Sequence, residues 1–188
     1  MVRKIDPLRE NLKTFCESYQ VDYVELNLDM PVRWNSTFKM IQVALRLKKP
    51  LDALMRNSLK LSNFILEDAE WKLVEDMAKY LRPFSKMTDK ISVQNIPTLS
   101  LTALIYVELY GHIESYKGMK GVHADVKTSA QKAKDKLDEY YDTTDSLVYV
   151  VATVLDPRCK LNWYSLVGYS HLTSKSMKMV TEHWENFY

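Results

Sequence analysis

The sequence predicts a mainly α-helical fold with one candidate β-strand, and three observations support this fold class. Four glycines and six prolines among 188 residues leave little room for a turn-rich β-sandwich. Nine methionines, together with many leucines, lysines and glutamates, favour helices. Apolar residues also recur at the three- and four-residue spacing of helices over most of the chain. With 46% hydrophobic residues, a chain of this length can bury a sizeable core.

In the first half of the chain, helices are predicted from apolar spacing and from the positions of prolines. Asp6 and Pro7 are typical of a helix cap followed by a first-turn proline, so a helix is expected from Asp6 to about Tyr19. Helical spacing returns after Pro31 and predicts further helices over residues 34–47, 51–55 and 71–81. Pro83 is expected to stop the last of these helices, because proline donates no backbone hydrogen bond.

The second half begins with a polar connector over residues 85–100 and is then predicted to be helical. Thr98 or Ser100 can cap the first helix of this half, and Asp125 can cap the second. Residues 148–154 are β-branched enough for a strand, but a buried helix is favoured there. The predicted helices cover residues 101–116, 125–140, 148–154 and 174–188.

The segment VDYVELNLD, residues 21–29, is the best strand candidate in the chain. Tyr23, Val24, Leu26 and Leu28 give it a partly alternating apolar character. A lone strand leaves its backbone N–H and C=O groups unpaired along both edges. The segment is therefore expected either to pair with strands outside this chain or to be an extended connector.

Charge and cysteine content narrow the classes of protein that this sequence can belong to. The net charge is +2, from 26 basic and 24 acidic side chains, so any contact with nucleic acid has to be local. Cys16 and Cys159 stand alone, so neither a zinc ribbon nor a disulfide framework is indicated. There is no secretory signal pattern, and no apolar run approaches the roughly 18 residues of a membrane span. An intracellular protein without a membrane partner is expected.

The sequence contains none of the common catalytic motifs. There is no phosphate-binding loop, GxGxxG, GxSxG or HExxH pattern, and the histidines lack carboxylates or cysteines at ligand spacing. Asp29 follows the strand candidate, as the metal-binding aspartates of nucleases do. It also stands two residues before Pro31, where a carboxylate that caps a helix or pairs with an arginine is expected. We therefore predict no catalytic residue and no metal ligand in this chain.

The segment Arg33, Trp34, Asn35, Ser36 is the best candidate for a functional site. It combines a guanidinium that can bind phosphate, a ring that can stack on an unpaired base, and small hydrogen-bonding side chains. The backbone N–H groups of a helix's first turn add a place that favours anions. The alternative is structural: Trp34 packs beneath the strand candidate, and Arg33 pairs with Asp29.

Three segments resemble signatures of the hAT superfamily of DNA transposases. The first resembles the family segment D-V-P-T-R-W-N-S-T-Y, with matches at Asp29, Pro31, Arg33, Trp34, Asn35, Ser36 and Thr37 and departures at Met30, Val32 and Phe38. The second resembles L-x-P-F-x-x-x-T, at Leu81, Pro83, Phe84 and Thr88, followed by a P-T pair at Pro97 and Thr98. The third resembles A-x-x-L-D-P-R-x-K, at Ala152, Leu155, Asp156, Pro157, Arg158 and Lys160. The three occur in the family's order, over about residues 20–165.

The resemblance implies an RNase H-like catalytic core interrupted by a large helical insertion. Residues 1–40 would be the distal fragment of the core, with a helix, one residual strand from the truncated core, and the RWNST segment. Residues 41–188 would be the helical insertion region. The family's three metal-binding acids and its BED-type zinc finger would lie outside this chain, so none of its catalytic residues carries over. The family's RWNST tryptophan lies near the active site and stacks on a DNA hairpin intermediate, and Trp34 is the matching position.

The predicted function is therefore that of a fragment or domesticated remnant of an hAT-type DNA transposase. It would bind DNA through Arg33, Trp34, Asn35 and Ser36 in the nucleus, without being an enzyme. No cofactor is expected, although the parent family uses a divalent metal, Mg or Mn. DNA is the expected partner, with a homo-oligomer left open and no small-molecule substrate. The alternative is a helical protein–protein interaction module without a DNA role, which would use an aromatic patch at Trp163, Tyr164, Trp184, Phe187 and Tyr188.

Overall fold

The computed structural model describes residues 6–30, 34–93, 98–144, 147–168 and 170–187. Over these residues the chain forms helices and no strand. The chain divides into two compact units, Met1–Ser85 and Lys86–Tyr188, which are called here the N-terminal and C-terminal units. The predicted mainly α-helical fold class is confirmed.

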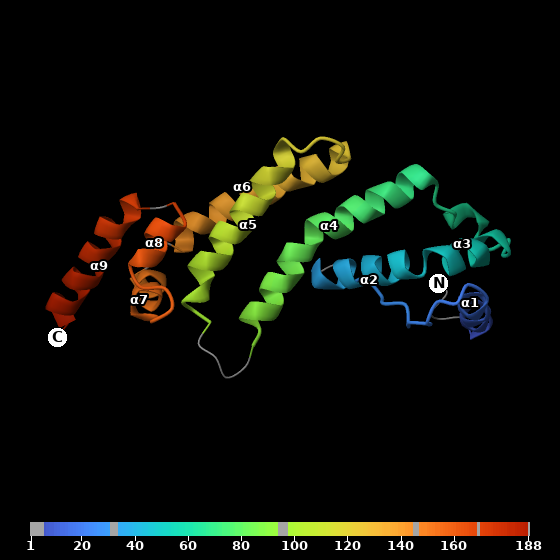
Figure 1. The fold of residues 1–188 in the computed structure, drawn as a ribbon, viewed down its shortest axis with the longest axis horizontal. Coiled ribbons are helices and arrows are strands. Elements are labelled where there is room, and N and C mark those ends of the chain that lie inside the picture. The colour runs from blue at the N-terminus through green and yellow to red at the C-terminus, as the bar shows by residue number, and fades with distance from the viewer. Residues whose placement is uncertain (1–5, 31–33, 94–97, 145–146, 169, 188) are drawn as a thin grey trace. The chain divides into compact units, whose positions relative to one another are not determined.

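The N-terminal unit is built on three short helices and the first part of a long one (Figure 1). They are α1 (Asp6–Ser18), α2 (Trp34–Arg46), α3 (Lys48–Arg56), the 3₁₀ turn η2 (Ser62–Phe64) and α4 (Asp68–Ile91). Helix α1 packs against α3, and the predicted helices at 6–19 and 34–47 are confirmed to within a residue. The core of the unit is formed by Leu8, Leu12, Cys16, Leu47, Leu54 and Leu61.

The residual strand predicted at residues 21–29 does not form. Residues 21–30 have no regular secondary structure, so the extended connector, which was the other option, is what forms (Figure 1). Among the described residues there is no second strand to pair with its backbone, and an unpaired strand is not stable alone. Its apolar residues Val21, Tyr23 and Leu26 pack instead, half-buried, against the core between α1 and α3. Tyr23 and Leu26 of the alternating pattern are therefore explained by packing on the helical core, whereas Leu28 is exposed.

The prediction that Pro83 stops a helix was wrong, because Pro83 lies inside α4. The helix continues through Pro83 to Ile91, so the polar connector begins later than the sequence suggested. Proline removes one backbone hydrogen bond, to the carbonyl four residues earlier, and packing can compensate for that single loss. The rings of Tyr80 and Phe84, 5.4 Å apart, pack together beside the proline.

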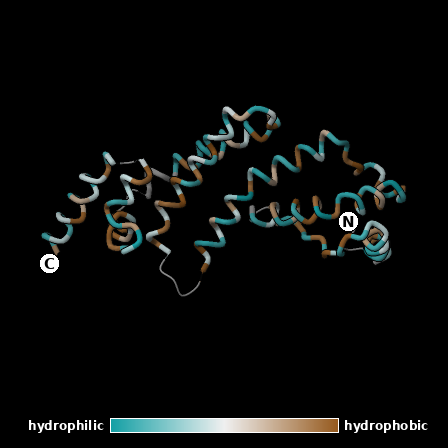
Figure 2. The backbone as a smooth tube through the Cα atoms, in the orientation of Figure 1, coloured by the Kyte–Doolittle hydropathy of each residue, from teal (hydrophilic) through white to brown (hydrophobic). Residues whose placement is uncertain are grey.

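In the C-terminal unit, the described residues form five further helices. They are α5 (Leu101–Lys117), α6 (Ala124–Thr144), α7 (Leu147–Leu155), α8 (Asn162–Leu166) and α9 (His171–Phe187). Helix α5 packs along α6 and touches α7, while α9 packs on α7 and α8. Figure 2 shows hydrophobic and hydrophilic residues mixed along α9, as expected for a helix with one buried face, whereas α7, LVYVVATVL, is apolar over nearly its whole length. The helix favoured over a strand at 148–154 is confirmed by α7.

The helix caps differ in detail from the predicted ones. Asp125 lies inside the first turn of α6, and its backbone N–H donates to Nδ1 of His123 at 3.2 Å. Gly121 precedes this turn with φ +79°, a left-handed conformation that glycine adopts without strain. Ser100 does precede α5, but its hydroxyl makes no cap bond. That hydroxyl has another partner, described below.

The predicted boundary between residues 40 and 41 falls within α2. The assignment of residues 1–40 to a core fragment and 41–188 to an insertion stays a prediction. None of the described helices has the length and apolar character that crossing a bilayer requires.

Candidate nucleic-acid interface

A hydrogen-bond network joins the connector to the start of α2. Thr37 Oγ1 donates to Asp29 Oδ1 at 2.7 Å, and Ser36 Oγ lies 2.9 Å from the same oxygen. The backbone N–H of Met30 donates to Ser36 Oγ at 2.7 Å. Asp29, Ser36 and Thr37 are called here the Asp29 network. It fixes where the chain turns from the connector into the helix.

The Asp29 network also sets the charge at this end of α2. The hydrogen bonds from Thr37 and Ser36, with a smaller contribution from the Met30 N–H, hold the pKa of Asp29 below its usual value. The carboxylate is therefore ionised at neutral pH. It lies beside the positive end of the helix dipole and offsets part of the attraction that this turn would exert on a phosphate. Asp29 thus has a structural role, since it binds the side-chain hydroxyls of the first turn of α2.

Two of the four predicted site residues can be placed. Arg33 lies outside the described residues, and Trp34 begins α2 with a side chain that is likewise not described. The Asn35 side chain is half-buried, and its Oδ1 has no hydrogen-bond partner in the part of the chain that the structure describes. Ser36 is engaged by Asp29 and Met30. The structure thus brings Ser36 together with Thr37, a residue that the predicted site omitted although the signature contains it.

A strong local charge lies in the same part of the chain and was missed in the sequence analysis. Residues 31–60 hold a single acidic side chain, Asp52, against seven basic ones: Arg33, Lys39, Arg46, Lys48, Lys49, Arg56 and Lys60. The near-neutral total of +2 hides this excess, because the acidic side chains lie elsewhere. Counting charge in a sliding window would have found it.

Several of these cations are available to a ligand. Arg46 lies 3.2 Å from Asp22, and Lys48 sits over the ring of Trp71 at 5.2 Å from its centroid. The single acid, Asp52, accepts a hydrogen bond from Trp71 Nε1 at 3.2 Å. Within the described ranges, the remaining exposed cations have no acidic partner: Lys39, Lys49, Arg56 and Lys60. Such a set of unpaired cations is typical of a surface that binds a polyanion.

A second network, in the C-terminal unit, is built on another signature residue. Asp156 accepts hydrogen bonds from Arg158 Nη2 at 2.7 Å, from Arg158 Nε and backbone N–H at 2.9 Å each, and from Ser100 Oγ at 2.5 Å. The Asp156 side chain is only 7% exposed. The Arg158 guanidinium, followed by the Ser100 hydroxyl, holds the pKa of Asp156 far below its usual range. We call these three residues the Asp156 network; it ties the end of α7 to the start of α5.

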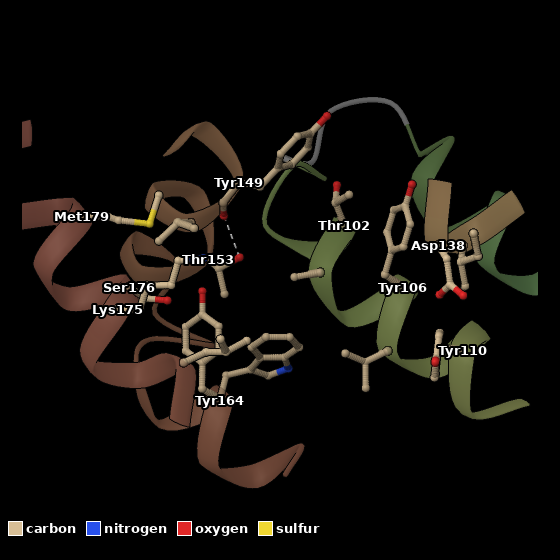
Figure 3. A pocket seen from close by; sticks show the side chains of 16 residues that line it. Thr102, Tyr106, Tyr110, Asp138, Tyr149, Thr153, Tyr164, Lys175, Ser176 and Met179 are labelled. Carbon is tan, nitrogen blue, oxygen red and sulfur yellow. Dashed lines mark hydrogen bonds between the residues drawn. The ribbon is translucent and has the colours of Figure 1, made fainter. Parts of the chain in front are cut away.

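The C-terminal unit also contains an aromatic-lined cavity of about 280 Å³ (Figure 3). Thr153 and Tyr164 lie across it from Tyr106, and Trp163 also lines it. The Thr153 hydroxyl donates to the Tyr149 carbonyl at 2.8 Å. The volume is just below the roughly 300–1,000 Å³ of small-molecule sites, so we assign no ligand to this cavity.

The aromatic residues predicted to form the patch of the alternative function differ in exposure: some are buried and others are exposed. Trp163 and Tyr164 are buried in the C-terminal unit and cannot form a surface, because they pack around the cavity. Trp184 and Phe187 of α9 are exposed. Tyr188 lies outside the described residues. A patch of all five residues was therefore wrong, and of the four that the structure describes, Trp184 and Phe187 are the exposed ones.

Comparison with known proteins identifies the class to which this helical chain is related. Residues 1–80 match the family model described as the ZBED1 RNase-like helical domain. Residues 112–188 match the model described as hAT-like transposase, RNase-H fold. The resemblance to the hAT superfamily of transposases is thereby confirmed.

Two curated relatives are similar to most of the chain. The "Putative transcriptional regulator tpeD" of Talaromyces stipitatus is 29% identical over 140 residues, which are 73% of this chain and 14% of that protein. The "Putative AC transposase" of Zea mays is 28% identical over 138 residues, 72% of this chain and 16% of that protein. The chain thus spans about one sixth or less of the length of these relatives. No solved structure matches.

Proposed function

We propose that this hAT-type transposase-related chain binds DNA through its N-terminal unit and does not catalyse strand cleavage by itself. One observation carries the proposal: residues 31–60 concentrate basic side chains, and four of them are exposed without an acidic partner among the described residues. A DNA backbone carries one negative charge about every 1.7 Å of duplex axis, so neutralising it releases counterions and favours binding. The relatives' printed names, a transposase and a transcriptional regulator, agree with a nuclear DNA partner.

In this proposal, the residues at and just before the start of α2 have two roles: some contact DNA, and Ser36 positions them. Arg33 binds a phosphate, and Trp34 stacks on an unpaired or distorted base, as the resemblance implies. Asn35 follows them directly in sequence, in the first turn of α2. Ser36 positions the others, because its hydroxyl is already hydrogen-bonded within the Asp29 network. The Asp29 carboxylate keeps the helix end itself from acting as the main phosphate site.

The proposed lack of catalysis rests on the resemblance. Metal-dependent strand cleavage needs several carboxylates around two divalent ions. The family's three acids lie outside the matched signatures, and Asp29 is held by two hydroxyls instead. Within the described ranges, no three His, Cys, Asp or Glu side chains come together as a metal site. Mg or Mn would act in the parent reaction and not in this chain.

The test is DNA affinity measured as a function of salt. Binding is expected to weaken steeply with salt, and Arg33→Ala should lower the slope of log K against log salt by about 0.9, the value for one phosphate. Trp34→Ala should weaken binding to hairpin-ended DNA by roughly 5- to 150-fold, the range for loss of one stacked base. Lys178→Ala is the matched control, because Lys178 lies 3.5 Å from Glu182 in the other unit.

A second candidate function, a protein–protein interaction module, is supported by α9. Trp184 and Phe187 are 64% and 71% exposed, and large exposed aromatic residues are enriched at interfaces. Absence of DNA binding at low salt would reject the DNA proposal and favour this one. Sedimentation of wild type and Trp184→Ala would then show whether the surface binds a second copy of the chain.

A further inference from the structure

The turn between α3 and α4 exposes two large apolar side chains. Leu59 is 96% exposed, more than any other large hydrophobic residue in the described ranges, and Phe64 is 58% exposed. Leu61, between them in sequence, is 3% exposed and belongs to the core of the N-terminal unit. The turn is therefore anchored in the core by one leucine while it presents another to solvent.

Local hydrogen bonds hold the turn in this conformation. The Leu61 N–H donates to the Ser58 carbonyl at 2.9 Å, and the Phe64 N–H donates to the Leu61 carbonyl at 2.9 Å. The Ser62 hydroxyl donates to the carbonyl of Leu59 itself at 3.0 Å. The carbonyl of Leu59 is thus hydrogen-bonded within the turn, while its side chain is exposed. An exposed leucine on a hydrogen-bonded turn is suited to insertion.

Basic residues lie close to this leucine in sequence. Lys60 follows it directly, and Arg56 ends α3 three residues before it. Lys49 lies seven residues before Arg56, so the two share a face of α3, about 10 Å apart along the axis. That face is opposite to the buried Leu54. In the described part of the chain, none of these three cations has an acidic partner.

We propose that the turn at residues 57–64 is a DNA-bending wedge. Leu59 enters between base pairs from the minor groove, while Arg56, Lys60 and Lys49 contact the flanking phosphates. Proteins that kink DNA combine apolar side chains inserted between base steps with basic side chains beside them, and this turn carries both. The inference rests on the proposed DNA binding and adds to it a second contact surface with its own mechanical effect.

The charge pattern favours DNA over another protein as the occupant. A protein partner would need a matching excess of acid, whereas a duplex supplies regularly spaced phosphates on both sides of the groove. An anionic membrane surface shares this chemistry in part, since it also accepts apolar and basic side chains. The experiment therefore includes vesicles of phosphatidylcholine and phosphatidylserine as a separate arm.

The experiment measures bending of a short duplex with fluorophores at its two ends, using the full chain. Wild type is expected to bend the duplex by an angle in the range of roughly 20–90°. Leu59→Ala should abolish the bend and leave the salt slope unchanged. Arg56→Ala and Lys60→Ala should each lower that slope by about 0.9. Leu166→Ala, which removes an 84% exposed leucine from α8, is the matched control and should change neither quantity.

The outcomes separate this inference from the proposed function. If wild type binds DNA and Arg33→Ala weakens binding, but Leu59→Ala bends DNA as wild type does, the wedge is rejected and the DNA function stands. If wild type shows no DNA affinity at low salt, the proposed function fails first and the wedge with it. Binding to phosphatidylserine vesicles that depends on Leu59, without DNA bending, would also overturn the wedge. The side chains of Leu59, Arg56, Lys60 and Leu166 are exposed, so loss of folding is not expected on their substitution. Circular dichroism checks the folding of every variant.

Discussion

The Asp29 and Asp156 networks use the same kind of residue in two different ways. Asp29 is exposed and bonds to hydroxyls seven and eight residues along the chain. Asp156 is nearly buried and bonds both to Arg158 and to Ser100, 56 residues away. The first is a local contact that joins the connector to the start of α2. The second is a long-range connection within a folded unit. Signature residues of this chain therefore hold local geometry in one unit and tertiary structure in the other.

The largest effect is expected from removing the long-range connection. Asp156→Ala leaves the buried Ser100 hydroxyl and the exposed Arg158 guanidinium without their shared acceptor. The melting midpoint, followed by circular dichroism, should fall by roughly 5 °C. The more conservative Asp156→Asn should cost less, since it retains one acceptor oxygen. Asp89→Ala, at an exposed aspartate near the end of α4, is the control. Equal melting midpoints for Asp156→Ala and Asp89→Ala would show that the Asp156 network does not stabilise the folded unit, and would contradict the difference drawn between the two networks.

A smaller and local effect is expected in the Asp29 network. Thr37→Val keeps the shape of the side chain and removes one hydrogen bond to Asp29, at a cost of about 1 kcal/mol. Hydrogen exchange should accelerate in the first turn of α2 and remain unchanged in α7 and α8. Thr128→Val is the control, because the Thr128 hydroxyl bonds only to the Ala124 carbonyl within α6. Faster exchange throughout the chain would mean that the Asp29 network is not local.

The smallest effect is a difference in acid sensitivity. Hydrogen bonding lowers the pKa of both aspartates, so their contributions are complete at pH 7, well above the ordinary value of about 3.9. Each contribution is lost as the pH falls through the folded-state pKa of that group. Because the pKa of Asp156 is the lower of the two, NMR signals at the start of α2 should change at higher pH than those around Ser100. The reverse order would show that the Arg158 guanidinium does not protect Asp156 as inferred.

Helices were predictable from the sequence because apolar spacing reports a buried face, and α1, α2, α5 and α7 follow it closely. The failures have physical causes. Pro83 was read as a stop, although a helix tolerates one missing hydrogen bond when its flanks are packed. In the segment 21–29, Val21, Tyr23 and Leu26 pack against a helical core, which a pattern alone does not distinguish from a sheet.

The candidate site was predictable in part. The signature located the start of α2, but the partners of Ser36 depend on a chain reversal that sequence spacing does not reveal. The same holds for the bond between Ser100 and Asp156, which joins two distant signatures. The basic segment at 31–60 could have been found from the sequence, whereas the exposure of Leu59 depends on which leucine of the turn enters the core.

Hydrogen exchange with and without DNA tests the central claim most directly, namely that the N-terminal unit provides the DNA-binding surface. DNA at low salt should slow exchange at the start of α2 and in the turn at residues 57–64, and added salt should reverse both changes. The C-terminal unit should be unaffected. Slowing confined to residues 86–188, or no slowing anywhere at DNA concentrations that saturate binding, would contradict the claim.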